Sequence, residues 1–192
     1  MDITAKRICV YCGSSNHVNQ RYKDTAFTIG QHLAEQGIGL VYGGGNVGLM
    51  KAVADGSLSK GGEVIGVIPK SLEDLELAHP NLTRIFVTQG MHERKSMMAQ
   101  LSDGFIALPG GYGTMEEVME VITWSQINVH RKPIGLYNMY GFYDGILQWV
   151  DHAHREGFIR DAHRQLLCSS NNIVDLLHQM AKVQFVELRS QI

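Results

Sequence analysis

The sequence predicts an α/β protein: a Rossmann-like, doubly wound parallel sheet of about seven strands with helices on both faces. Three observations support this class. Short apolar runs alternate with helix-like segments along the chain, which is typical of parallel strands joined by crossover helices. The run at residues 105–108 is continuously apolar, as expected of a strand buried on both faces. Two glycine-rich loops follow strand-like segments, where ligands of open α/β sheets bind.

Length and composition fit one Rossmann-like nucleotide-binding domain over residues 1–192. A chain of 192 residues with 44% hydrophobic content can bury a full core. A formal net charge of −2 gives no general attraction to nucleic acid or to an anionic membrane, so we expect neither as a partner. The N-terminal residues show no signal-like segment and no apolar run is long enough to span a bilayer, so we expect a cytoplasmic protein.

Neither the cysteines nor the histidines form a recognisable metal or redox motif. Cys9 and Cys12 have C-x-x-C spacing but lie at the end of a predicted strand, and no second pair completes a zinc site. We interpret them as buried structural residues, with redox or metal use as the alternative. His152 and His154 are two apart on a predicted helix and so face different directions. We expect no metal and no cofactor.

The first elements are a strand, a helix and a second strand. Residues 7–15 contain the apolar run Ile-Cys-Val-Tyr and end in small hydroxyl residues, of which Ser14 is a candidate ligand contact. Residues 19–36 have helical spacing of apolar side chains and stop before Gly37, a residue typical of helix ends. Residues 38–42 form the second predicted strand.

A glycine loop then separates the second strand from a helix. Residues 43–48 satisfy G-x-G-x-x-G, which in a dinucleotide-binding unit requires an acidic residue at the end of the next strand. That strand, residues 63–68, is followed by Pro and Lys70 instead. We therefore disfavour nicotinamide or flavin binding. Gly43, Gly44 and Gly45 are interpreted as a second wall of a mononucleotide or sugar-phosphate pocket.

A loop at residues 71–81 and a strand at residues 83–88 lead to a helix at residues 91–101. On that helix Arg94 lies on the same stripe as Met97, Met98 and Leu101. A charge on an apolar stripe is costly without a partner. Arg94 therefore either pairs with an internal carboxylate, for which Glu117 is a candidate, or meets an anionic ligand or a developing charge.

The central motif is the strand at residues 104–108, a glycine turn and a new helix. Pro109 and the glycines at positions 110, 111 and 113 allow a sharp turn and close approach of a ligand to the backbone. Thr114 is predicted to open the helix. Its first turn would direct unpaired N–H groups and the positive end of the helix dipole into the loop, which makes an anion site suited to phosphate.

Glu117 has two interpretations. Thr-Met-Glu-Glu at residues 114–117 matches a capping box, in which Thr114 and Glu117 satisfy backbone donors at the helix start. Alternatively, Glu117 is a carboxylate held beside a phosphate-bearing ligand. A carboxylate does not help to bind an anion, so that position would suggest chemistry.

The C-terminal third repeats the alternation. A strand is predicted at residues 132–137 and a helix beginning at residue 141, whose aromatic residues would belong to the core or to a subunit contact. A last strand at residues 166–170 precedes Asn172, a predicted helix cap, and a terminal helix at residues 173–180.

Met-His-Glu-Arg-Lys at residues 91–95 and Pro-Gly-Gly-Tyr-Gly-Thr-Met-Glu-Glu at residues 109–117 resemble the motifs of one family. This is the Lonely Guy (LOG) family of cytokinin riboside 5′-monophosphate phosphoribohydrolases, often mislabelled lysine decarboxylases. The resemblance covers nearly the whole chain. It implies hydrolysis of the N-glycosidic bond of an adenosine 5′-monophosphate, typically N6-modified, giving free base (a cytokinin or adenine) and ribose 5-phosphate. Several bacterial members are similar to AMP nucleosidases, and the resemblance also suggests a homodimer.

The resemblance also implies site residues. Arg94 and Glu117 correspond to the catalytic pair of the family. The substrate contacts that it implies are Lys95, Gly111, Tyr112, Gly113, Thr114, Thr123 and, in a loop that departs from the plant-like pattern, Glu76. Our candidate substrate-binding set also includes Ser14, Gly43, Gly44, Gly45, Gly110, Met115 and Glu116.

The residues and the resemblance agree on a mechanism. Cleavage of a ribosyl C1′–N9 bond develops positive charge on the sugar, which a nearby carboxylate stabilises. Phosphate held by the amides of residues 110–114 would fix the ribose beside Glu117. Two alternatives remain. One is a nucleotide-binding or carrier module without chemistry. The weaker one is a pyridoxal-phosphate lysine decarboxylase, which needs a Schiff-base lysine and a partner for the pyridine nitrogen that the sequence does not identify.

Overall fold

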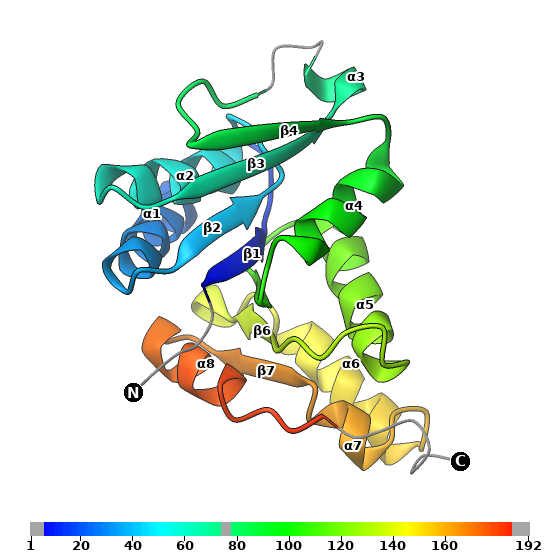
Figure 1. Cartoon of the computed structure of the whole chain (residues 1–192). Coiled ribbons are helices and arrows are strands. Elements are labelled where there is room, and N and C mark those ends of the chain that lie inside the picture. Colours follow the sequence, from blue (N-terminus) through cyan, green and yellow to red (C-terminus); the bar gives the residue numbers. More distant parts are fainter. Residues whose placement is uncertain (1–5, 74–77, 186–192) are drawn as a thin grey trace.

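A computed structural model describes residues 6–73 and 78–185 of the chain (Figure 1). These residues form a seven-stranded, entirely parallel sheet in the order β4-β3-β2-β1-β5-β6-β7. This confirms the predicted fold class. The strands are β1 (Arg7–Tyr11), β2 (Gly39–Tyr42), β3 (Val64–Pro69), β4 (Arg84–Thr88), β5 (Gly104–Ala107), β6 (Ile134–Tyr137) and β7 (Leu167–Ser170).

The sheet grows in two directions from its centre. Successive strands from β1 to β4 extend one way, and β5 then pairs with the opposite edge of β1, with Ile8 in register with Gly104. The loops that leave β1 and β5 therefore diverge to opposite faces of the sheet. In an open α/β sheet this switch point leaves a crevice at the carboxyl ends of the strands, where ligands bind.

Helices cover both faces of the sheet and bury a core on each (Figure 1). One core contains side chains from α1 (Gln20–Glu35), α2 (Gly48–Ser59) and α8 (Ile173–Met180). The other contains side chains from α4 (Met91–Gln100), α5 (Tyr112–Gln126) and α6 (Asp144–Arg155). The remaining helical segments are α3 (Lys70–Glu73), η1 (Met139–Gly141) and α7 (Asp161–Arg164). In the described part of the chain, no helix combines the length and apolar character needed to cross a membrane.

The long elements form close to their predicted positions. Asn19 and Asn172 cap α1 and α8 by accepting hydrogen bonds from Arg21 N and Asp175 N, so the predicted cap of α8 is confirmed. Cys9 and Cys12 are buried free thiols, and burial raises the pKa of both, which fits the predicted structural role. Of the predicted aromatic contacts of α6, Tyr143 lies in the core and Trp149 is exposed.

Three local predictions were wrong. The segment predicted as a loop at residues 71–81 begins with the short helix α3, while residues 74–77 lie outside the described residues. Helix α6 starts at Asp144 rather than at residue 141, because Gly141 has φ +75° and ends a preceding 3-10 turn. Thr114 does not open α5, which begins at Tyr112 with Gly111 as its N-cap.

Candidate active site

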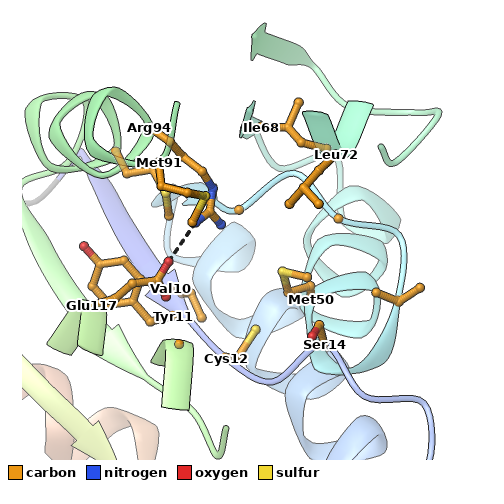
Figure 2. A pocket seen from close by; sticks show the side chains of 15 residues that line it. Val10, Tyr11, Cys12, Ser14, Met50, Ile68, Leu72, Met91, Arg94 and Glu117 are labelled. Carbon is orange, nitrogen blue, oxygen red and sulfur yellow. Dashed lines mark hydrogen bonds and ion pairs between the residues drawn. The ribbon is translucent and has the colours of Figure 1, made fainter. Parts of the chain in front are cut away.

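A cavity of about 320 Å³ opens at the carboxyl ends of the central strands (Figure 2). Its walls come from the end of β1 and the loop after it, from β3, and from helices α2, α3, α4 and α5, together with glycines 43 and 45. This is the crevice expected at the switch point between β1 and β5. The volume is at the lower end of the range for small-molecule sites, which suits a compact ligand such as a mononucleotide.

A buried ion pair lies in this cavity. Arg94 Nη1 on α4 donates to Glu117 Oε1 on α5 at 2.9 Å, and the two side chains are only 9% and 11% exposed (Figure 2). Arg94 Nε also donates to the carbonyl oxygen of Val67 in β3 at 3.0 Å. The guanidinium is therefore held at two points, and the predicted pairing of Arg94 with an internal carboxylate is confirmed.

Glycine at position 43 makes room for the guanidinium. A Cβ atom on Gly43 would lie 2.1 Å from Arg94 Nη2, closer than any non-bonded contact allows. A larger residue at position 43 would therefore have to displace either the turn or the guanidinium, and the guanidinium is anchored to Glu117 and Val67. Gly43 and Gly45 both line the cavity, as the interpretation of this loop as a second wall predicts.

Burial raises the pKa of Glu117. The Arg94 charge and its hydrogen bond oppose this effect, the neighbouring Glu116 charge adds to it, and Lys95 opposes it again. The net direction is upward, so desolvation outweighs the ion pair. A carboxyl group that is costly to ionise, beside a cavity, is typical of catalytic sites.

The helix start at the floor of the cavity has the form of an anion site. Helix α5 begins at Tyr112 without a side-chain cap and without an acidic residue in its first turn, and Gly113 lines the cavity. The first N–H groups of a helix have no intrahelical partner, and the dipole favours negative charge there. Gly110 permits the turn, because a Cβ at this position would meet Thr114 Oγ1 at 2.0 Å.

The capping-box interpretation of Glu117 was wrong. Thr114 is the third residue of α5 and is buried, and Gly111 makes no side-chain cap hydrogen bond. Glu117 is engaged with Arg94 across the gap between α4 and α5. The sequence pattern failed because α5 begins two residues earlier than the capping box requires. The N-cap is Gly111, so Thr114 lies inside the first turn and cannot act as the cap.

The structure brings together only part of the predicted site. The predicted residues that line the cavity are Ser14, Gly43, Gly45, Arg94, Gly113 and Glu117. Gly110 and Gly111 line an adjacent cavity of about 290 Å³ that also includes Ser14. Gly44 lies between the two lining glycines with φ +75°, a backbone conformation that favours glycine.

Other predicted contacts lie elsewhere. Lys95 does not line the cavity and pairs with Glu116 and with Glu120 Oε1, the latter at 3.0 Å. Tyr112 is 98% exposed, and Thr123 donates its hydroxyl to Met119 O on its own helix. Met115 is half-buried against the core that contains α4 and α5. Glu76 lies outside the described residues.

Three methionines of the cavity wall were not predicted as site residues. Met50, Met91 and Met98 line the cavity from α2 and α4 (Figure 2 labels the first two). A signal was available for two of them, since Met91 and Met98 lie on the helix stripe that carries Arg94. Thioether side chains adapt to irregular shapes and make favourable contacts with aromatic rings, which suits the flat faces of a purine.

Sequence comparison identifies close relatives. The family described as possible lysine decarboxylase matches residues 50–180. The cytokinin riboside 5′-monophosphate phosphoribohydrolase LOG of Oryza sativa subsp. japonica is 49% identical over 172 residues, which make up 90% of this chain and 71% of that protein. The enzyme of the same activity named LOG7 in Arabidopsis thaliana is 44% identical over 189 residues, covering 97% of this chain and 87% of that protein.

Solved structures show the same fold. The Moco carrier protein from Chlamydomonas reinhardtii matches with a TM-score of 0.69 at 21% identity, covering 92% of this chain and 98% of that one. The molybdenum cofactor binding protein from Rippkaea orientalis matches with a TM-score of 0.68 at 23% identity, covering 90% of this chain and 94% of that one. At these identities the likeness concerns the fold alone.

Proposed function

The chain belongs to the LOG family of cytokinin riboside 5′-monophosphate phosphoribohydrolases, and from this premise we propose that its reaction takes place in the cavity beside Arg94 and Glu117. The enzyme hydrolyses the N-glycosidic bond of a cytokinin riboside 5′-monophosphate, which is an N6-modified adenosine 5′-monophosphate, and releases free base and ribose 5-phosphate. The observation that carries the proposed site is the buried Arg94–Glu117 pair, which lies in the same cavity as the start of α5.

The arrangement suggests how substrate is held. The 5′-phosphate would bind the N–H groups at the start of α5, near Gly113, and the base would lie against the methionine wall. The ribose then falls between them, beside Glu117. Binding energy from the phosphate, distant from the reacting bond, would fix the sugar in the reactive position.

Each catalytic side chain then has a role. As the C1′–N9 bond breaks, its electron pair leaves with the base and positive charge develops on the sugar, next to the Glu117 carboxylate. Water adds to C1′, and the proton that it loses goes to the departing base, so the products are the neutral free base and ribose 5-phosphate. Arg94 binds Glu117 Oε1 and so orients the carboxylate, whose second oxygen can serve the sugar or the water.

The substitution Glu117→Gln tests this assignment. We expect it to retain nucleotide affinity and to lower the rate of base release by roughly 10³-fold, because the amide cannot stabilise developing positive charge. A chromatographic assay for free base from AMP and isopentenyl-AMP measures the rate, and calorimetry measures the affinity. Glu156→Gln, which removes an exposed carboxylate at the end of α6, is the matched control. Near wild-type hydrolysis by the Glu117 variant would refute the assignment.

The same assay separates the alternatives. A carrier module would bind nucleotides without releasing base under any condition. The decarboxylase reaction would need a lysine for a Schiff base, but within the described residues lysine is absent from the cavity lining. The neighbouring Lys95 instead engages the carboxylates of Glu116 and Glu120.

The proposal also covers activity on unmodified AMP, cellular location and oligomeric state. Activity on unmodified AMP, similar to that of AMP nucleosidases, follows if the methionine wall accepts adenine alone. A cytoplasmic location agrees with the free thiols of Cys9, Cys12 and Cys168, because disulfides are rare in that compartment. A homodimer agrees with exposed large apolar side chains such as Trp149 and Phe158. Sedimentation at twice the chain mass of 21.4 kDa would support the dimer.

A further inference from the structure

His79 is a buried side chain that the proposed mechanism does not use. Its side chain is only 1% exposed, and it lies outside the cavity lining. Its Nδ1 atom accepts a hydrogen bond from Asn81 N at 3.2 Å, and its Nε2 atom lies 2.9 Å from Asp55 Oδ1. Since Nδ1 is the acceptor, the neutral ring carries its proton on Nε2 and donates it to Asp55. Both ring nitrogens are therefore engaged.

The backbone around His79 is joined to the glycine wall of the cavity. His79 N donates to Gly44 O at 2.9 Å, and Ala78 forms an antiparallel bridge with Gly45. The segment at residues 78–79 therefore binds the backbone of the turn at residues 43–45. That turn includes two of the glycines that line the cavity, and Gly43 contacts the Arg94 guanidinium.

Asp55 fixes the other end of this connection. It lies on α2, the helix that follows the glycine loop, and it accepts hydrogen bonds from His79 and from Lys51. The glycine turn, α2 and the segment at residues 78–79 thus form a closed set of contacts. The imidazole is the side chain that connects the last two. Its loss would free the segment at residues 78–79 from α2, and the turn would keep its backbone contacts to that segment and the hydrogen bond that the Tyr42 hydroxyl donates to Gly45 O.

We propose that His79 is a positioning residue, which holds the 43–45 turn in the place that nucleotide binding requires by binding Asp55. This inference rests on the cavity being the substrate site. Arg94 has its own anchors, Glu117 and Val67 O, so a displaced turn changes the fit of the cavity wall more than it changes the catalytic pair. The wall contacts substrate in both the ground state and the transition state. Its displacement therefore raises KM and leaves kcat nearly unchanged.

Two substitutions of His79 separate its two hydrogen bonds. In His79→Asn the amide replaces the Nδ1 side of the ring and loses Asp55, whereas in His79→Gln it reaches the Nε2 position and keeps Asp55. We expect the KM for AMP to rise roughly tenfold in His79→Asn, the equivalent of one lost hydrogen bond. His79→Gln should restore KM to within about threefold of wild type. Lys51→Met, which removes the exposed partner of Asp55, is the matched control and should leave KM unchanged.

A purely structural role predicts a different result. His79→Asn would then lower the melting temperature and the active fraction, and with it the apparent kcat, while KM stayed at the wild-type value. That result, or an equal effect of Lys51→Met, would overturn the proposal. If His79→Asn does not fold, Asp55→Ala removes the same hydrogen bond through its more exposed partner. A rise in KM would then support the proposal, and an unchanged KM would overturn it.

Failure of the role proposed for His79 and failure of the proposed function give different results. If the wild-type enzyme released no base from any monophosphate, the site assignment would fail. The dissociation constant of AMP, measured by calorimetry, would then replace KM as the readout for His79. An unchanged dissociation constant in His79→Asn would overturn the role of His79 itself.

Discussion

At the scale of single residues, the position of the Arg94 guanidinium depends on the lack of a side chain at Gly43. The Cβ of an alanine at position 43 would lie 2.1 Å from Arg94 Nη2, so the guanidinium or the turn must move. Movement of the guanidinium disturbs its 2.9 Å hydrogen bond to Glu117. Displacements of about 1 Å at catalytic groups can reduce rates by roughly 10²-fold.

We therefore expect Gly43→Ala to lower kcat/KM for AMP by about 10²-fold or more while the protein remains folded. Steady-state kinetics measures the loss, and circular dichroism verifies the fold. Gly90→Ala is the matched control, since a Cβ there meets nothing within 4 Å and the backbone is extended at φ −161°. Full activity in Gly43→Ala would show that the arginine position is unimportant for the reaction.

The charges beside Glu117 predict a pH effect with a definite sign. In the proposed mechanism Glu117 acts as a carboxylate. Burial raises its pKa, so activity should rise with pH along a limb displaced above the ordinary value of 4.5. Glu116 raises this pKa further and Lys95 lowers it. Glu116→Gln should therefore move the limb to lower pH, and Lys95→Met should move it to higher pH.

The profile of kcat/KM against pH measures both shifts. Glu93→Gln on the exposed side of α4 is the control and should leave the limb in place. Shifts of both variants in the same direction would contradict the electrostatic account. A large rise in KM with no shift in Lys95→Met would instead favour the role of Lys95 as a substrate contact.

The residue pattern predicted some of the site and not the rest. Arg94 could be assigned an internal partner because a charge on an apolar stripe requires one. The partners of Lys95 were not predicted, although Glu116 and Glu120 are four apart and so share a face of α5. The pattern on one helix does not reveal which face of another helix lies opposite it, and the role of His79 depends in the same way on tertiary contacts.

At the scale of elements, α1 and α2 pack closely through glycines. A Cβ on Gly30 of α1 would lie 2.1 Å from the carbonyl oxygen of Val53, and one on Gly56 of α2 would lie 2.0 Å from that of Phe27. Backbone atoms cannot move aside as a flexible side chain can. Each added methyl group would therefore force the two helices apart.

We expect Gly30→Ala to reduce the free energy of unfolding by about 1–3 kcal/mol in urea denaturation. Gly145→Ala is the control, because this glycine lies in α6 with no neighbour within 4 Å of its added Cβ. Alanine there should leave stability unchanged or raise it by up to ~0.5 kcal/mol. If Gly30→Ala were as stable as the wild type, α1 and α2 would tolerate being moved apart.

Elements were predictable where the signal is long or chemically specific. Helix α8 was predicted within its observed bounds because an asparagine cap and an amphipathic stripe coincide. Helices α3 and α7 have four residues each, too few for a periodic pattern, so α7 was missed and α3 was assigned to a loop. The start of α5 was misplaced by two residues because a glycine N-cap has no side-chain signature.

At the scale of the whole molecule, the sheet order determines where the site forms. Because β5 pairs with β1 on the side opposite β2, the two glycine loops approach one crevice although they are more than sixty positions apart. Alternating strands and helices were sufficient to predict the parallel sheet and this edge as the ligand site. They could not predict which side chains of α4 and α5 would meet there, because that depends on how the helices pack.

A cavity built from so many elements exists only in the folded chain, so a bound nucleotide should stabilise the whole molecule. With Glu117→Gln to prevent turnover, AMP at about 100 times its dissociation constant should add about 2.7 kcal/mol to the free energy of unfolding. For a chain of this size that corresponds to a rise in melting temperature of roughly 5–10 °C. Adenosine at the same concentration should cause a much smaller rise, because it lacks the phosphate that the start of α5 is proposed to bind. Thermal unfolding followed by fluorescence measures both, and equal shifts for AMP and adenosine would show that the phosphate is not bound at α5.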